Sequence, residues 1–275
     1  MSSHRLNALD ILKHLNRSNC RECGAPTCMA FAALVVQGQQ DPRTCPHLAP
    51  GVLDDLASRV EQHRNNVDEQ RREALEQLKT ELDGVDFQAA SERLGVPLRD
   101  GRLLFHCLGR VFEIDAQGNL HSQCHNNPWL HVPLLDHLMH GEGAQPQGSW
   151  VPFSELRGAA DWSRFFNHRC AQPLESIARD HVELFFDILD IFGGEPQPPD
   201  VAQQGAVADR AVVIHPIRKA PILFCYWDAA EGFEARLTLL FDRTVEKNLS
   251  AGSLFQLAGG LVEMLRRMVV THGDA

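Results

Sequence analysis

The chain has 275 residues, enough for one large domain with an appendage or for two modest domains. It is 44% hydrophobic and 23% charged, as globular proteins are, and no apolar run approaches the roughly 18 residues that a membrane span needs. The formal net charge of −10 argues against a nucleic-acid partner, because an acidic surface repels the phosphate backbone. We therefore expect a protein with no membrane span and no nucleic-acid partner.

The first predicted element is a short amphipathic helix over residues 6–15, where apolar residues recur at helical spacing. Residues 1–19 also hold charged side chains such as Arg5, Asp10 and Lys13 and have no continuous apolar core, so we expect no signal peptide. The predicted localisation is therefore cytoplasmic, where cysteines stay reduced.

Four cysteines follow with the spacing C-x2-C-x4-C-x16-C: Cys20, Cys23, Cys28 and Cys45. Four thiolates are the ligands that a 4Fe–4S cluster requires, one for each iron. The first three fall on a short loop that can enclose one side of a cluster, and the fourth returns after a predicted helix. Pro46 directs the chain away from that fourth cysteine, as in bacterial cluster motifs. The pattern predicts a 4Fe–4S cofactor.

The residues between the cysteines suit this interpretation. Gly24 permits a tight turn directly after the second cysteine, and Thr27 is a candidate N-cap for a helix that begins near Cys28. The first helical turn favours a thiolate and an anionic cluster. Phe31 and its apolar neighbours can shield the cluster from water, and Gly38 is placed to end the helix.

Two other interpretations of the four cysteines stay open. A structural zinc ion also takes four thiolates, although such sites more usually pair two C-x2–4-C knuckles, which the lone distant Cys45 does not provide. A disulfide framework agrees less well with the reducing compartment that we expect.

With these residues, the segment resembles the small iron–sulfur domain of the corrinoid iron–sulfur proteins of anaerobic carbon fixation. That pattern is C-x-x-C-G-x-x-x-C-x-x-F-A, then Gly, then C-P. Similar motifs occur in electron-transport subunits of ion-pumping redox complexes. The resemblance spans about residues 6 to 50 and implies a 4Fe–4S cluster of low potential and an electron-transfer role. Its matching positions are Cys20, Cys23, Gly24, Cys28, Phe31, Ala32, Gly38, Cys45 and Pro46.

The next predicted element is a long connecting helix from Leu53 to Leu82. This stretch is polar, carries a thin apolar stripe at helical spacing, and holds neither glycine nor proline. The stretch without glycine or proline ends at Gly84.

The remainder of the chain shows runs of strands and runs of helices without regular βαβ alternation, which favours the α+β class. Strands are predicted at Leu103–Leu108, Val111–Asp115, Ala211–Ile217, Ile222–Trp227 and Phe233–Phe241, and helices at Trp129–His140, Trp162–Phe166, Leu174–Phe192 and Leu254–Val270. Residues 193–199, rich in Gly and Pro, are predicted as a linker. The predicted organisation is a helical 4Fe–4S domain at 1–52, the connecting helix at 53–84, and an α+β domain at 85–275.

From about residue 85 to 272 the chain resembles the domain-of-unknown-function 3786 family of bacteria, whose members often follow such a cluster motif. The resemblance implies a fold and no biochemical role. Its matching stretches are Pro133–Leu135, Gly148–Leu156, Arg169 after Phe165 and Phe166, and Leu240–Asp242.

Other residues can carry chemistry, and for each the structural explanation is favoured. Histidines and cysteines gather near Cys124 in a spacing that matches no familiar metal motif: His106, Cys107, His121, His125 and His131. We expect these histidines, like His137 and His140, to be hydrogen-bonded or exposed. Cys170 and Cys225 are predicted to be buried apolar residues, Trp150 a core residue, and Asp242 either a cap or a pocket residue.

The preferred hypothesis is a cluster protein that passes single electrons to or from a protein redox partner. An alternative is a cluster-dependent enzyme with a small-ligand pocket lined by polar groups such as His121, Arg169 or Asp242. A third hypothesis is a sensor or structural protein, whose fold loosens when the cluster is lost.

Overall fold

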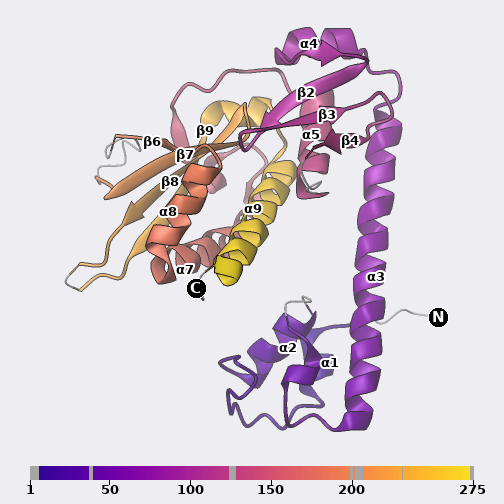
Figure 1. The fold of residues 1–275 in the computed structure, drawn as a ribbon, viewed down its shortest axis with the longest axis vertical. Coiled ribbons are helices and arrows are strands. Elements are labelled where there is room, and N and C mark those ends of the chain that lie inside the picture. The colour runs from indigo at the N-terminus through magenta and orange to yellow at the C-terminus, as the bar shows by residue number, and fades with distance from the viewer. Residues whose placement is uncertain are drawn as a thin grey trace. The chain divides into compact units, whose positions relative to one another are not determined.

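The structure, a computed structural model, describes residues 6–36, 40–123, 128–198, 201, 207–230 and 232–272 (Figure 1). The chain divides into two compact units, Met1–Gln77 and Leu78–Ala275. The domain boundaries predicted after residues 52 and 84 stay predictions. In the described part of the chain, no helix is both long and apolar enough to cross a membrane.

The first unit is helical. Its elements are α1 (Ala8–Leu12), α2 (Cys28–Val36), the 3₁₀ turn η1 (Pro42–Thr44) and the first part of α3 (Pro50–Glu81). Asn7 caps α1 in a reciprocal arrangement with Asp10, and the predicted cap Thr27 accepts a hydrogen bond from the Ala30 amide at 3.0 Å. The predicted helix end at Gly38 lies outside the described residues.

The core of this unit joins α1, α2 and the start of α3. Ile11, Phe31, Val35 and Leu56 are fully buried in it. Cys28 and Cys45 belong to the same cluster of buried residues. The core therefore holds two of the four cysteines beside the aromatic ring that the sequence predicted as their shield.

The second unit begins with the end of α3, the helix α4 (Phe87–Leu94) and a four-stranded antiparallel sheet. Its strands pair in chain order: β1 (Leu98–Arg99), β2 (Arg102–Cys107), β3 (Arg110–Ile114) and β4 (Leu120–Ser122). The two longer strands agree with the predicted ones, whereas β1 and β4 are too short for sequence periodicity to indicate.

A second antiparallel sheet of five strands has the order β5-β9-β8-β7-β6. The Leu108 amide donates to the His215 carbonyl at 3.0 Å, and the Arg218 amide donates to the His106 carbonyl at 3.2 Å, so main-chain bonds join the two sheets. The strands of the second sheet are β5 (Trp150–Pro152), β6 (Glu195–Pro196), β7 (Arg210–Ile217), β8 (Ala220–Trp227) and β9 (Arg236–Asp242).

Helices pack against these sheets and against one another, with α9 in contact with α5, α6, α7 and α8. The unit therefore has the α+β architecture that the sequence predicted. Its remaining elements are α5 (Pro128–His140), η2 (Phe153–Glu155), α6 (Ala160–Phe166), the π-helical turn η3 (Asn167–Ala171), α7 (Gln172–Asp180), α8 (Val182–Ile191), η4 (Arg243–Lys247) and α9 (Ala251–His272).

Two predictions for this unit were wrong. The helix predicted over Leu174–Phe192 is broken at His181, which has φ −141° and ψ 53°. The break lets α7 pack on β9 while Phe185 of α8 contacts Phe224 of β8. The predicted linker 193–199 contains β6, an edge strand, where proline is tolerated because a missing N–H faces no further strand.

Candidate metal centre

Cys20 and Cys23 lie on a loop before α2 whose backbone enters the left-handed region several times. Arg17, Asn19, Arg21 and Gly24 have φ of 57°, 51°, 64° and 80°. The Gly24 amide donates to the Arg21 carbonyl at 2.8 Å and closes a turn. A Cβ added at Gly24 would meet nothing within 4 Å, so the glycine is needed for its backbone angle rather than for space.

A side-chain hydrogen bond ties this loop to α2. The Cys28 amide donates to the Asn19 side-chain oxygen at 2.8 Å, which satisfies one of the amides left open at the start of a helix. Cys28 therefore lies in the first turn of α2, as predicted. Asn19 was not among the residues predicted for the site, although it stands directly before Cys20 in the sequence.

The fourth cysteine follows η1. Asp41 caps this turn by accepting from the Arg43 amide at 2.8 Å, and Cys45 comes next. The Gln40 side-chain amide donates to the carbonyl of Cys23, which brings the segment before η1 to the cysteine loop. The Gln40 Oε1 atom is buried and has no hydrogen-bond partner among the described residues, so a polar group beside the cysteines is unsatisfied.

The four cysteines differ in exposure. Cys28 and Cys45 are buried at 9% and 7% exposure, Cys23 is half-buried, and Cys20 is exposed. All four are free thiols in the structure, without a disulfide between them. The site thus has a buried side against the core of the first unit and a side open to solvent at Cys20.

The distances between the four thiol sulfurs can be compared with those around a bound zinc ion. Sulfurs around a tetrahedral zinc ion lie about 3.8 Å apart, given Zn–S distances of about 2.3 Å. In the described part of the chain, no three of these four thiols have sulfurs within 4.8 Å of one another. Zinc binding by these thiols would therefore require their sulfurs to move closer together.

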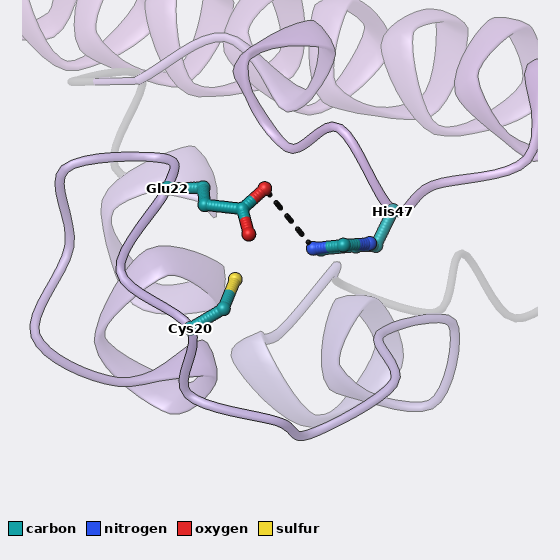
Figure 2. Close-up of side chains that lie close together, drawn as sticks. All are labelled: Cys20, Glu22 and His47. Carbon is teal, nitrogen blue, oxygen red and sulfur yellow. Dashed lines mark ion pairs between the residues drawn. The ribbon is translucent and has the colours of Figure 1, made fainter.

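A second group of donors meets at the open side of the site. Cys20, Glu22 and His47 each offer one ligand atom, and these atoms all lie within 4.8 Å of one another (Figure 2). The His47 Nε2 atom is 3.3 Å from a Glu22 carboxylate oxygen. Glu22 and His47 were not among the predicted site residues, although each stands two residues from a cysteine of the motif.

Histidines of the second unit are hydrogen-bonded, as predicted. His121 Nε2 is 2.7 Å from Asp115, and His131 Nε2 is 2.6 Å from the Gly118 carbonyl. Burial opposes ionisation of Asp115, but hydrogen bonds from His121, Asn119 and Gln117 outweigh it and lower the pKa of Asp115 to about 2. Cys124 and His125 lie outside the described residues.

Three cysteines of the second unit are buried apolar residues rather than nucleophiles. Burial raises the pKa of Cys170 to about 12 and of Cys225 to about 11, and raises that of Cys107 as well. Their thiols therefore stay protonated at neutral pH.

Two hollows of the second unit are lined by residues other than those suggested for a cluster-dependent enzyme. Asp242 is fully buried and accepts from the main-chain amides of Gln147, Gly148 and Thr244, so it is a structural cap. A hollow of about 460 Å³ near the β1–β2 turn and one of about 260 Å³ beside α7 are lined by other residues. Neither includes His121, Arg169 or Asp242.

Two protein families match the chain. The family described as "Putative Fe-S cluster" matches residues 15–47, and the family described as "Domain of unknown function (DUF3786)" matches residues 86–264. The first match contains all four cysteines of the motif and His47. The second covers most of the second unit.

Curated relatives match a short part of the chain. The chain is similar to the corrinoid/iron–sulfur protein large subunit of Moorella thermoacetica, with 39% identity over 51 residues, and to the acetyl-CoA decarbonylase/synthase complex subunit gamma of Methanopyrus kandleri, with 38% identity over 52. The subunit gamma from Methanocaldococcus jannaschii is 41% identical over 44 residues. These matches cover 16–19% of this chain and about a tenth of each relative. No solved structure matches the chain.

Proposed function

Since this chain belongs to the DUF3786 family and carries an iron–sulfur motif before that domain, we propose that it is a 4Fe–4S protein that exchanges single electrons with a protein partner. The proposed ligands are Cys20, Cys23, Cys28 and Cys45. The observation that carries the proposal is a set of four free thiols spread over a buried and an open side, beside a fully buried Phe31.

A bound cluster of this type supplies one-electron redox chemistry. The chain's own residues hold it and control its access to water. Phe31 and Val35 of α2 exclude water on the buried side, and the helix dipole at the first turn of α2 favours the thiolate of Cys28. Cys20 lies at the surface, where a partner can approach the metal group.

The relatives support a protein partner for this region. Two of them are named as the gamma subunit of the acetyl-CoA decarbonylase/synthase complex, and the similarity spans 44–52 residues of this chain. We propose that the same segment of this chain docks a redox protein. The DUF3786 domain would then contribute recognition rather than ligands.

The first experiment measures the composition of the full chain purified without oxygen. We expect about four irons and four sulfides per chain and an EPR signal after reduction. Cys28→Ser and Cys45→Ser should each lose most of the iron. The matched control is Cys225→Ala, a buried cysteine of β8, which should keep it. One zinc and no sulfide per chain, with the zinc lost in both Cys28→Ser and Cys45→Ser, would contradict the proposal.

A redox titration distinguishes the electron-carrier hypothesis from the sensor hypothesis. An electron carrier is expected to give the same EPR signal after several cycles of oxidation and reduction, with one reversible midpoint potential. Loss of iron and sulfide during the first oxidation would instead favour the sensor hypothesis.

A further inference from the structure

We infer that Cys20, Glu22 and His47 form a second metal site, for a single divalent transition ion of the zinc type. Figure 2 shows the three side chains directed toward one another from two segments, the loop that holds Cys20 and Glu22 and the turn that holds His47. One thiolate, one imidazole and one carboxylate with an open fourth position is a ligand set that zinc accepts.

The distances suit one ion rather than a cluster. Around a tetrahedral ion, N, O and S ligand atoms lie about 3.3 to 3.8 Å apart, given metal–ligand distances of about 2.0–2.3 Å. Glu22 and His47 already have this separation at 3.3 Å, and the Cys20 sulfur lies within 4.8 Å of both. Small side-chain rotations would therefore complete the site.

Local backbone geometry explains why the three donors meet. Arg21, between Cys20 and Glu22, has φ 64°, and the turn from Arg21 to Gly24 follows. On the other segment, the Leu48 amide donates to the Cys45 carbonyl at 3.4 Å, and Leu48 is buried while His47 is exposed. Two turns thus present the donors at the surface.

The charges also balance. Cys20 would bind as a thiolate and release one proton to solvent, His47 would bind as the neutral imidazole, and Glu22 as the carboxylate. The two negative charges neutralise the divalent ion, and a water molecule takes the fourth position. The ion replaces the contact between Glu22 and His47 that the structure shows.

This site shares Cys20 with the proposed cluster ligands, so one thiolate cannot serve both metal groups. A bound ion is therefore expected to block assembly of the full cluster, and cluster assembly to expel the ion. This competition rests on the proposed function, whereas the single-ion site does not.

The test is a titration of the metal-free full chain with Zn²⁺ and with Co²⁺, whose absorption reports thiolate ligands. One ion per chain with a charge-transfer band of one thiolate is expected. His47→Ala and Cys20→Ser should each weaken binding tenfold or more. Cys45→Ser and the control His14→Ala, another exposed histidine of this unit, should leave it unchanged.

Binding that survives His47→Ala but is lost in Cys45→Ser would overturn the inference in favour of a four-thiolate zinc site, and so would an absence of Zn²⁺ binding. Iron and sulfide contents of the same variants report on the cluster separately. His47→Ala should keep four irons per chain, and Cys45→Ser should lose them. If the chain does not bind a single ion at this site, the iron and sulfide contents still show whether the cluster is bound.

Discussion

At the scale of single residues, buried polar side chains organise the second unit. Asp242 ends β9 with no exposed surface, and its carboxylate also accepts from the Thr244 hydroxyl at 2.5 Å. It joins the segment before β5 to the start of η4, at distances of 2.9 Å to the Gln147 amide and 2.6 Å to the Gly148 amide. One carboxylate thus holds two chain segments that lie far apart in the sequence.

Replacing this carboxylate should destabilise the second unit strongly. Asp242→Ala leaves the buried Thr244 amide and hydroxyl without their acceptor, and an unpaired buried donor costs about 1–3 kcal/mol. We expect a loss of about 2–3 kcal/mol in the free energy of unfolding, measured by denaturant unfolding of the full chain. The control Glu155→Ala removes an exposed ion pair with Arg243 and should change it by less than about 1 kcal/mol. Equal losses in both variants would contradict this account.

His137 is a second buried polar residue, and its burial affects how stability depends on pH. It is 1% exposed, and its Nδ1 lies 3.0 Å from the Asn248 carbonyl, which accepts the proton of the neutral ring. Burial lowers the pKa of His137 to about 4, and the nearby charges of Lys219 and Arg93 act in the same direction, while the Asn248 contact opposes them. The folded state therefore holds this histidine neutral.

This lowered pKa predicts a loss of stability in mild acid. In the unfolded chain the histidine takes a proton near its ordinary pKa of about 6.5, so the unfolded state binds more protons below that pH. The free energy of unfolding should fall between pH 6.5 and 4, by up to about 3 kcal/mol from this residue. Unfolding curves of the wild type and of His137→Asn at pH 7 and pH 5 check it. The variant should show a smaller change with pH; an equal change would exclude His137 as the cause.

At the scale of elements, close packing between α5 and α9 positions the C-terminal helix. Gly260 of α9 faces Trp129 of α5, and a Cβ at this glycine would lie 2.2 Å from the indole Cγ. The neighbouring Gly259 has nothing within 4 Å of such an atom. Close packing therefore leaves no room for a side chain at Gly260, whereas the neighbouring position has room for one.

The pair provides a matched test of this packing. Gly260→Ala should destabilise the second unit by about 1–3 kcal/mol, because the new methyl group overpacks the contact with Trp129. Gly259→Ala should be neutral or stabilise it by up to about 1 kcal/mol, since alanine favours the helix. Thermal unfolding of both variants measures the difference. Similar shifts in the same direction would show that α5 and α9 do not pack as the structure has them.

At the scale of the whole molecule, the two compact units have different means of stabilisation. The second unit has two joined sheets and a large buried core of its own. The first is small, and two of its core side chains, Cys28 and Cys45, are proposed metal ligands. A small domain with a modest core commonly depends on a bound metal for part of its stability.

Removal of the cluster is therefore expected to loosen one unit selectively. After iron is removed by a chelator without oxygen, amide hydrogen exchange should accelerate in α1, α2 and the segment 40–48. Strands β8 and β9 should exchange as before, because their partners are all in the second unit. Mass-spectrometric exchange of the full chain, with and without cluster, tests this. Equal acceleration in both units would contradict a stabilising role confined to the first.

Sequence by itself determined the features that depend on local spacing. The cysteine motif, the cap at Thr27 and the long helix α3 could all be predicted, because ligand spacing, capping and helical periodicity are properties of neighbouring residues. The α+β class followed from the order of strand and helix patterns. That Cys20, Cys23, Cys28 and Cys45 are the ligands stays a prediction.

Only the tertiary structure decided which distant residues meet. The helix breaks at His181 because α7 packs on β9 while Phe185 of α8 contacts β8. The carboxylate of the buried Asp242 accepts hydrogen bonds from amides about 95 positions away in the chain. The group of Cys20, Glu22 and His47 belongs to this class too, since it forms only when two turns bring segments 25 residues apart together. Such contacts arise from the folded path of the chain, which no local pattern encodes.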